Sequence, residues 1–502
     1  MTEHFDMIEH FDMIIVGAGI SGIGAGVHLK KHCPDRSYMI LEGRPNIGGT
    51  WDLFRYPGIR SDSDMYTLGF NFKPWTDQKA IADGDSILRY LDETAREYDL
   101  YEKIRFGHHV EAAAWDSRTA RWTVTARADG KPVQFTCNFL YMCSGYYRYE
   151  AGYTPQFEGA ESFRGRIIHP QHWPQDLDYA GKRVVVIGSG ATAVTLVPEI
   201  AKTAHVTMLQ RSPTYMISRP AEDRFANWLR RWLPPMAAYN IVRWRNVAMQ
   251  QWLFRLARSK PEKLKKRLLG GVRDLLGPGY DVKTHFTPTY NPWEQRLCLV
   301  PDDDLFDAIR EGRAEVATDH IDRFTETGIL LKSGKTLDAD IVVTATGLDL
   351  LFMAGIDVTL DGRKVDFPKT YGYKGIMFSG VPNLAVAFGY TNASWTLKAD
   401  LTSEYLCRVL NHMKETGTDT VTPTLVDPNM EAEPWIDFSS GYFQRGLHQF
   451  PKQGKAVPWR LNQNYAGDVK MFRHAPVDDG VLRFSKAADA SAQRAPEAIA
   501  AE

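Results

Sequence analysis

The chain opens on an apolar run followed by glycines, the pattern of a buried strand that leads into a turn and a helix. Residues 11–16 are mostly apolar, residues 17–22 contain three glycines, and residues 23–31 can form a helix. A second short apolar stretch, 38–41, ends at Glu42. This order of strand, turn, helix and strand predicts a βαβ unit with parallel strands.

Further along, alternation of polar and apolar side chains replaces the buried-strand pattern. Residues 121–126 and 133–137 alternate in this way, and Asp129-Gly130 lies between them. An Asp-Gly pair in this position predicts a β-hairpin. A second strand-turn-helix pattern begins at residues 184–187, and residues 224–290 favour helices interrupted by prolines.

Together these patterns predict an α/β fold with two dinucleotide-binding, Rossmann-like domains and a helical insert in the second domain. We expect two separate stretches of chain to form the first domain. The expected boundaries are 9–148 and 332–486 for the first domain, 149–331 for the second, about 220–290 for its insert, and 487–502 for a disordered, Ala-rich tail.

The composition narrows the class of protein. Of the 502 residues, 44% are hydrophobic and 24% charged, which is typical of soluble globular proteins. Sixty basic and sixty-one acidic residues give a net charge of −1, which argues against a nucleic-acid-binding protein. No run of about 18 apolar residues is long enough to span a membrane. The first residues lack the pattern of a secretion signal, so we expect a cytoplasmic protein.

The cysteines lie far apart in the sequence. They form no CxxC pair and have no spacing typical of metal ligands, so we expect neither a disulfide framework nor a metal site. The redox-active disulfide that flavoprotein disulfide reductases require is also missing. The five cysteines are Cys33, Cys137, Cys143, Cys298 and Cys407.

The near-zero net charge conceals one strongly basic segment. Residues 224–267 contain twelve Lys or Arg and one acid, Glu262, so this segment carries +11 and the rest of the chain −12. It also contains Trp228, Trp232, Trp244 and Trp252 among many aliphatic residues. Two interpretations stay open: an insert that packs on the second domain with a solvated basic face, or a peripheral contact with a membrane surface.

The first glycine turn has the GxGxxG spacing of a dinucleotide-binding site. Gly17 permits a tight turn, Gly19 lets the backbone approach a pyrophosphate, and Gly22 lets the helix pack closely on the strand. The start of the following helix would face the anion. Glu42, at the end of the second strand, can accept hydrogen bonds from a ribose.

A second turn repeats this arrangement with one difference. Gly188-Ser189-Gly190-Ala191-Thr192 is followed by alanine in the third glycine position, and the next strand ends in Arg211-Ser212 instead of an acid. An arginine in this place suits the 2′-phosphate of NADPH. One acidic and one basic dinucleotide site in the same chain indicate FAD in the first and NADPH in the second, the cofactor pair of a flavin-dependent oxidoreductase.

Between the two turns lies a longer motif, FxGxxxHxxxWP. Its residues are Phe163, Gly165, His169, Trp173 and Pro174. By this motif the chain resembles the type I Baeyer–Villiger monooxygenases. Further stretches, such as 48–66, 290–298 and 458–465, resemble the ethionamide-activating subgroup of that family, and the resemblance extends from about residue 9 to residue 485.

The resemblance implies roles for individual residues. FAD would be held by Gly17, Gly19, Ser21, Gly22, Glu42, Thr50, Trp51, Asp52, Leu53, Asp62 and Val110. Arg60, Ser61 and Asp62 would lie where the nicotinamide meets the flavin. Gly188, Ser189, Gly190, Ala191, Thr192, Arg211 and Ser212 would hold the rest of NADPH.

The resemblance also identifies Arg296 as the active-site arginine, with Asp62 orienting its guanidinium. An arginine stays cationic at any working pH, so it can stabilise a developing negative charge without donating a proton. One departure from the family pattern stands beside it. Many relatives have a lysine that contacts the 2′-phosphate immediately before this arginine, whereas this chain has Gln295. More of the preference for NADPH would then rest on Arg211.

The implied activity is NADPH- and O2-dependent conversion of ketones to esters through a C4a-peroxyflavin, with sulfide and thioamide oxidation as a side activity. Three alternatives remain at this stage. They are a flavin-containing N- or S-monooxygenase, an NADPH-flavin reductase that does not oxygenate, and a flavoprotein without enzymatic activity.

Overall fold

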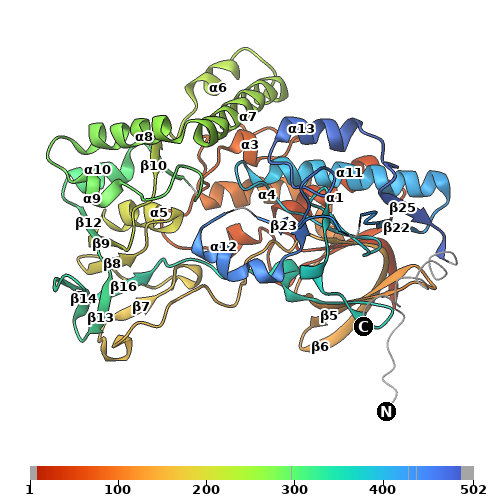
Figure 1. Cartoon of the computed structure of the whole chain (residues 1–502), viewed down its shortest axis with the longest axis horizontal. Coiled ribbons are helices and arrows are strands. Elements are labelled where there is room, and N and C mark those ends of the chain that lie inside the picture. The colour runs from red at the N-terminus through yellow and green to blue at the C-terminus, as the bar shows by residue number, and fades with distance from the viewer. Residues whose placement is uncertain (1–7, 296, 428, 437, 488–502) are drawn as a thin grey trace.

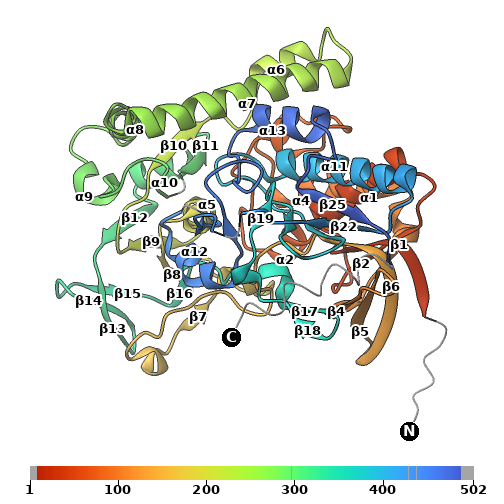
Figure 2. The same cartoon turned by 45° about the vertical axis from the view of Figure 1, so that its right-hand side comes forward.

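Two sheets, one mixed and one parallel, and their covering helices form the body of the protein (Figures 1 and 2). The computed structural model describes residues 8–295, 297–427, 429–436 and 438–487. The expected disordered tail therefore lies almost entirely outside the described residues.

The first sheet joins strands from both ends of the chain. Its parallel part places β1 between β2 and β6, and Val16 at the end of β1 pairs with both Leu41 and Met142. Three strands therefore end at the same level, and the residues that follow them meet at one edge of the sheet. The parallel strands are β1 (Glu9–Val16), β2 (Tyr38–Leu41), β3 (Ile104–Arg105), β6 (Lys131–Met142) and β21 (Leu384–Val386).

A mostly antiparallel extension continues the first sheet, with one parallel pair between residues 357–360 and 112–115. Ala128 pairs with Lys131 across Asp129-Gly130, so the predicted hairpin is confirmed. The strands of the extension are β4 (His109–Asp116), β5 (Arg121–Ala128), β17 (Asp357–Leu360) and β18 (Arg363–Lys364).

The second sheet has five parallel strands in the order β12-β9-β8-β16-β7. They are β7 (Arg166–Ile168), β8 (Arg183–Ile187), β9 (His205–Gln210), β12 (Ala314–Thr318) and β16 (Ile341–Thr344). Because β16 pairs with β7 on one side and β8 on the other, the boundary expected at residue 332 falls too early. We propose that the chain leaves the second domain after Thr344.

Helices cover both sheets, and the pleat of the strands divides the first core into two. Ile15 and Ile40 face a cluster that includes residues of α1 and α11, whereas Ile14 and Met39 face a cluster on the opposite side. The helices on the first sheet include α1 (Ile20–His32), α3 (Met65–Leu68), α4 (Gly84–Glu97) and α11 (Trp395–Thr416), and those on the second are α5 (Ala191–Ile200) and α10 (Asp304–Arg310).

The insert forms the upper margin of the molecule in both views (Figures 1 and 2). The prolines in this region begin helices, because a proline at the first helical position sacrifices no intrahelical hydrogen bond: α7 begins at Pro235 and α8 at Pro261. Its elements are β10 (Met216–Arg219), α6 (Arg224–Leu229), α7 (Pro235–Ser259), α8 (Pro261–Leu276), α9 (Val282–Phe286) and β11 (Cys298–Pro301). In the part of the chain that the structure describes, no helix has the length and apolar character needed to cross a membrane.

Smaller elements complete the fold. Three short helices are α2 (Thr50–Leu53), α12 (Gly441–Gly446) and α13 (Tyr465–Val469). The small antiparallel sheets are formed by β13 (Ile321–Thr325), β14 (Gly328–Leu331) and β15 (Thr336–Asp338); by β19 (Gly372–Tyr373) and β20 (Met377–Phe378); by β22 (Thr420–Pro423) and β25 (Leu482–Ser485); and by β23 (Glu433–Pro434) and β24 (Lys452–Gln453).

Candidate active site

A cavity of about 1040 Å³ is lined by the residues that follow the parallel strands of both sheets. Gly17 follows β1, Glu42 follows β2, and Gly188 and Arg211 follow β8 and β9 in the second sheet. Ligands of open α/β sheets bind outside the carboxyl ends of the strands. The two glycine turns, 171 residues apart in the sequence, thus open into one cavity.

The first turn is closely packed. A Cβ atom on Gly22 would lie 1.8 Å from the carbonyl oxygen of Gly17, so only glycine lets α1 approach the turn. Gly17 itself has a φ of +103°, a conformation that side chains disfavour. Gly19 caps α1 without a side-chain hydrogen bond, so backbone N–H groups at the helix start are available to an anion.

Glu42 is buried beside this turn. Its carboxylate accepts hydrogen bonds from the backbone N–H of Ala18 at 2.7 Å and of Arg44 at 2.8 Å. Burial raises the pKa of Glu42, while these two hydrogen bonds oppose that shift. A carboxylate has about four acceptor positions, so Glu42 can accept further hydrogen bonds from a ligand.

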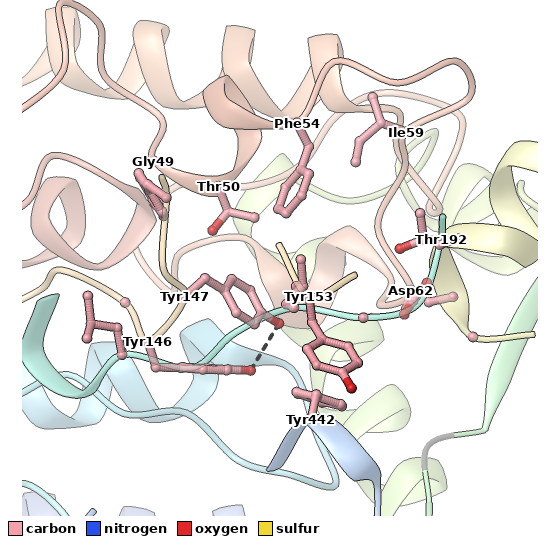
Figure 3. A pocket seen from close by; sticks show the side chains of 18 of the residues that line it. Gly49, Thr50, Phe54, Ile59, Asp62, Tyr146, Tyr147, Tyr153, Thr192 and Tyr442 are labelled. Carbon is pink, nitrogen blue, oxygen red and sulfur yellow. Dashed lines mark hydrogen bonds between the residues drawn. The ribbon is translucent and has the colours of Figure 1, made fainter. Parts of the chain in front are cut away.

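The opposite wall of the first site comes from the segment before α2. Gly49 has a φ of +55°, and a Cβ atom on it would lie 3.1 Å from the Cα of Gly19. Two backbone segments without side chains therefore border a narrow cradle beside the start of α1. Ser21 also lines the cavity, where its hydroxyl accepts a hydrogen bond of 2.7 Å from the indole N–H of Trp395. Thr50, Trp51 and Val110 complete this wall, and Figure 3 shows Gly49 and Thr50 side by side.

Three residues predicted to contact FAD lie behind the wall. Gly22 lies where α1 packs against the first turn. The buried carboxylate of Asp52 pairs with Arg44 at 2.5 Å and with Arg55 at 2.7 Å, so this side chain holds the wall together instead of facing the cavity. Leu53 packs into the core of the second sheet.

The second turn is open at its second glycine. Gly188 has a φ of +138°, and a Cβ atom on it would lie 2.3 Å from the carbonyl oxygen of Ala345, whereas a Cβ on Gly190 would meet no atom within 4 Å. Gly190 caps α5 without a side-chain hydrogen bond, which again leaves backbone N–H groups for an anion. Ser189 donates to the carbonyl oxygen of Ser212 at 3.0 Å. Ser212 and Arg211 are exposed at the cavity wall.

The segment 60–62 also lines the cavity. Arg60 forms an ion pair of 2.5 Å with Asp304 at the start of α10, and Ser61 is buried. Asp62 is exposed to the cavity and lies near Thr192 in Figure 3. Arg296 falls outside the described residues, so its role stays a prediction. Its neighbours Gln295 and Leu297 both line the cavity.

An aromatic wall, formed by Tyr146, Tyr147, Tyr153 and Tyr442, was not predicted from the sequence (Figure 3). The hydroxyl oxygens of Tyr146 and Tyr147 are 3.3 Å apart. The guanidinium of Arg445 from α12 lies 3.4 Å from the ring centre of Tyr153 and covers it. The signal available in the sequence was position, because Tyr146 and Tyr147 closely follow the carboxyl end of β6.

The FxGxxxHxxxWP residues stand behind the cavity, next to the two chain segments that join the sheets. The ring of His169 packs on Gly152, where any Cβ would come within 2.0 Å, and its Nε2 atom lies 3.1 Å from the carbonyl oxygen of Gly347. Gln171 donates to the carbonyl oxygens of Arg148 and Tyr149. The motif therefore fastens residues 148–153 and 345–347, which both border the cavity.

The other motif residues support this contact. A Cβ atom on Gly165 would lie 2.3 Å from the carbonyl oxygen of Asp340 and 2.5 Å from the ring of Phe163. The ring of Trp173 meets that of Tyr179 edge-on, with 6.2 Å between the ring centres, and Pro174 follows it. These residues shape the junction and do not themselves line the cavity.

Comparison with known proteins identifies the family. A family model described as flavin-binding monooxygenase-like matches residues 70–242, and one described as an NAD(P)-binding Rossmann-like domain matches residues 15–81. The FAD-containing monooxygenase EthA of Mycobacterium tuberculosis is 55% identical over 482 residues, which cover 96% of this chain and 99% of that protein. This chain belongs to the FAD-containing monooxygenases of the Baeyer–Villiger type.

Other relatives of this monooxygenase agree. The probable FAD-binding monooxygenase AlmA of Acinetobacter baylyi is 51% identical, over 96% of this chain and 98% of that protein. A steroid monooxygenase bound to NADP has the same fold, with a TM-score of 0.76 and 21% identity over 95% of this chain and 100% of that one. A cyclohexanone monooxygenase from Rhodococcus sp. Phi1 bound to NADP+ matches with a TM-score of 0.69 and 21% identity, over 83% and 87% of the two chains.

These findings confirm the predicted α/β fold with two dinucleotide-binding domains, the flavoprotein monooxygenase class, and FAD and NADPH as the cofactors. They do not assign individual residues, whose roles therefore remain proposals. Within the described residues, no cluster of three or more His, Cys, Asp or Glu could hold a metal ion.

Proposed function

We propose that this monooxygenase inserts one oxygen atom of O2 beside the carbonyl carbon of a ketone and so forms an ester. NADPH supplies the hydride and a proton is taken up, so that the second oxygen atom leaves as water and NADP+ is formed. Sulfides and thioamides are proposed as further substrates. The FxGxxxHxxxWP motif and the ketone-related names of the structural neighbours, cyclohexanone and steroid monooxygenase, support this proposal.

The first site fits FAD. The start of α1 offers backbone N–H groups to the pyrophosphate, and Gly19 and Gly49 leave room for it where a Cβ atom would intrude. Glu42 would accept hydrogen bonds from the ribose. The side chains of Ser21, Thr50 and Trp51 and the segment around Asp62 and Val110 would border the rest of the flavin nucleotide.

The second site fits NADPH. The start of α5 offers N–H groups to its pyrophosphate, and the exposed guanidinium of Arg211 can pair with the 2′-phosphate in a bidentate manner. Ser189, Thr192 and Ser212 would complete the phosphate contacts, and Arg60 and Ser61 would lie towards the nicotinamide. Because Gln295 brings no positive charge, we expect Arg211 to provide most of the preference for NADPH over NADH.

Bound FAD would take the hydride and activate O2, and the protein would supply the charge and the dry surroundings. Arg296 would stabilise negative charge on oxygen without donating a proton, and Asp62 would orient it by a charge-assisted hydrogen bond. The aromatic wall would exclude water from the reacting atoms. The observation that carries the proposal is that both glycine turns, Asp62 and this wall border one cavity.

The test is product analysis with the purified, FAD-loaded protein. We expect ketones of increasing chain length to give esters that carry one atom from ¹⁸O2, in proportion to the NADPH consumed. Oxidation of sulfides without any ester would favour the N- or S-monooxygenase alternative. Hydrogen peroxide as the sole product of oxygen would favour a reductase, and FAD binding without NADPH turnover would favour a flavoprotein without enzymatic activity.

The Arg296→Ala variant tests the proposed catalytic role. We expect it to keep anaerobic flavin reduction by NADPH and to lose about 100- to 1000-fold in the rate of ester formation. The matched control is Arg363→Ala, which removes an exposed arginine on β18 and should leave both rates unchanged. Ester formation at the parent rate in Arg296→Ala would remove this residue from the reaction.

A membrane-associated location belongs to the proposal as well. We expect the enzyme to contact membranes peripherally through residues 224–267, which would bring it close to apolar substrates dissolved in the lipid.

A further inference from the structure

Large apolar side chains are exposed together on α6, α7 and the turn between them. In the described residues, other exposed large apolar side chains are scattered: Ile8, Ile167, Val426 and Val457. We call the gathered set the aromatic ridge, and its members are between 38% and 74% exposed. It consists of Phe225, Trp228, Trp232, Ile241, Trp244, Met249 and Trp252.

The ridge is held in place by the opposite face of α7. Arg243 donates to the backbone carbonyl oxygens of Tyr66 and Gly69, each at 2.8 Å, and Asn246 donates to Asp64 at 2.8 Å. Both side chains are buried, so α7 is fixed on the body around α3. Ile241, Trp244, Ala248 and Trp252 are exposed at intervals of three or four residues and therefore form one stripe along α7. At one edge of this stripe, the ring of Trp244 also contacts Tyr465 of α13.

An ordinary surface helix has an apolar face towards the core and a polar face towards solvent. In α7 the inward face buries Ala238, Tyr239, Val242 and Val247 beside Arg243 and Asn246, while the outward stripe carries Ile241, Trp244 and Trp252. The stripe is thus too apolar for a face that only meets water, and a contiguous exposed apolar patch marks an interaction site.

Positive charge surrounds the ridge. Arg231 and Arg255 are exposed beside it, and the outer face of α8 continues it with exposed Lys263 and Lys266. Arg243 and Arg245 pair with Asp400 and Asp223. The three helices α6, α7 and α8 run along one margin of the molecule (Figure 2).

We propose that the aromatic ridge is a docking surface for an anionic lipid bilayer. Tryptophan is favoured at the membrane–water interface, and basic residues beside it would meet the lipid phosphates. A second copy of this chain fits less well, because a two-fold interface would bring the same basic surface against itself. This docking surface deepens the peripheral membrane contact proposed above, because it names the side chains and the lipid charge. It is independent of the reaction that the enzyme catalyses, so vesicle binding and ester formation can fail separately.

The experiment measures flotation of the full-length, FAD-loaded protein with lipid vesicles. We expect it to float with vesicles of phosphatidylcholine mixed with phosphatidylglycerol at low salt, and to bind vesicles of phosphatidylcholine alone much more weakly. The triple variant Trp228→Ser/Trp232→Ser/Trp252→Ser should bind about tenfold less, or weaker still. Arg231→Gln/Lys263→Gln/Lys266→Gln should lose a similar factor on the anionic vesicles only.

The matched control removes exposed apolar side chains elsewhere. Ile8→Ser/Val426→Ser should bind vesicles like the parent, and all variants should keep the parent FAD content and melting temperature, so that a loss of binding is not a loss of fold. Sedimentation of the protein without lipid tests whether a second copy of this chain covers the ridge instead. Parent binding that is equal on neutral and anionic vesicles, or unchanged in the tryptophan variant, would overturn the proposal. So would a dimer that the tryptophan variant turns into monomers.

Discussion

The two glycine turns have the same backbone plan and very different surroundings. In the first, a Cβ atom on Gly22 would collide with the carbonyl oxygen of Gly17, Gly19 lies against Gly49, and Glu42 is buried with both carboxylate oxygens bonded to backbone N–H groups. In the second, Gly190 has open space around it, and the polar side chains at the end of β9, Arg211 and Ser212, are exposed.

This difference matches what the two cofactors must do. FAD stays on the enzyme through many turnovers, so an enclosed cradle with a buried acid suits it. NADPH must enter and be replaced, so an open turn with an exposed cation suits it. How closely the protein surrounds the turn, more than the GxGxx pattern itself, therefore distinguishes a site for a resident cofactor from a site for an exchanging one.

Adding one methyl group to each turn should give the largest contrast. Gly22→Ala would place a Cβ atom 1.8 Å from a backbone oxygen that cannot move freely, and we expect a loss of stability of about 3 kcal/mol or more together with loss of bound FAD. The measurements are the ratio of flavin to protein absorbance and the melting temperature.

Gly190→Ala is the control in the second turn, because its new Cβ atom would meet nothing within 4 Å. It changes the second glycine position, since the third position of this turn is already Ala193. It should keep the parent FAD content and melting temperature. Equal damage from the two substitutions would mean that the sites do not differ in enclosure.

Much of this arrangement could be predicted from the sequence, because strand ends and glycine turns are local features. The order of strand, turn, helix and strand was enough to predict that Gly17 lies near Glu42 and that Gly188 lies near Arg211. The aromatic wall could not be predicted, because Tyr146 and Tyr442 come from elements that lie about 300 residues apart and share no local pattern.

Asp52 and β16 illustrate the same limit. The carboxylate of Asp52 looks available in the sequence, but Arg44 and Arg55 occupy it once the chain has folded. The strand β16 carries a buried-strand pattern that fits either sheet, and its pairing with β7 and β8 is decided by tertiary contacts. The exposed apolar side chains of α7 could likewise not be predicted, because the sequence does not show which face of this helix packs on the body of the protein.

Removing the exposed cation of the second site should have an intermediate effect. Arg211→Ala would lose a charge-assisted pair worth about 1.5–3 kcal/mol, so we expect the KM for NADPH to rise about 10- to 100-fold. The KM for NADH and the FAD content should not change. Steady-state kinetics with both nucleotides provide the measurement, and an equal rise for NADH would show that Arg211 does not read the 2′-phosphate.

The smallest expected effect is a pH dependence at the junction between the two sites. Burial lowers the pKa of His169, while its contact with the carbonyl oxygen of Gly347 opposes the shift. The unfolded chain therefore binds a proton at a pH where the folded His169 is still neutral. This contribution to stability is present above the ordinary histidine pKa of about 6.5 and is lost as the pH falls below it, by at most about 1.4 kcal/mol per pH unit.

The variant His169→Gln isolates this contribution, because glutamine does not titrate and its amide can still donate a hydrogen bond to Gly347. Other histidines, such as His32 and His285, also have lowered pKa values, but their contributions to the pH dependence cancel when variant and parent are compared. We expect the free energy of unfolding to fall less steeply in the variant than in the parent between pH 7 and pH 5. Parallel curves would mean that His169 is protonated as easily in the folded enzyme as in the unfolded chain. His169 at the junction of the FAD and NADPH sites would then contribute the same free energy of unfolding at acidic pH as at neutral pH.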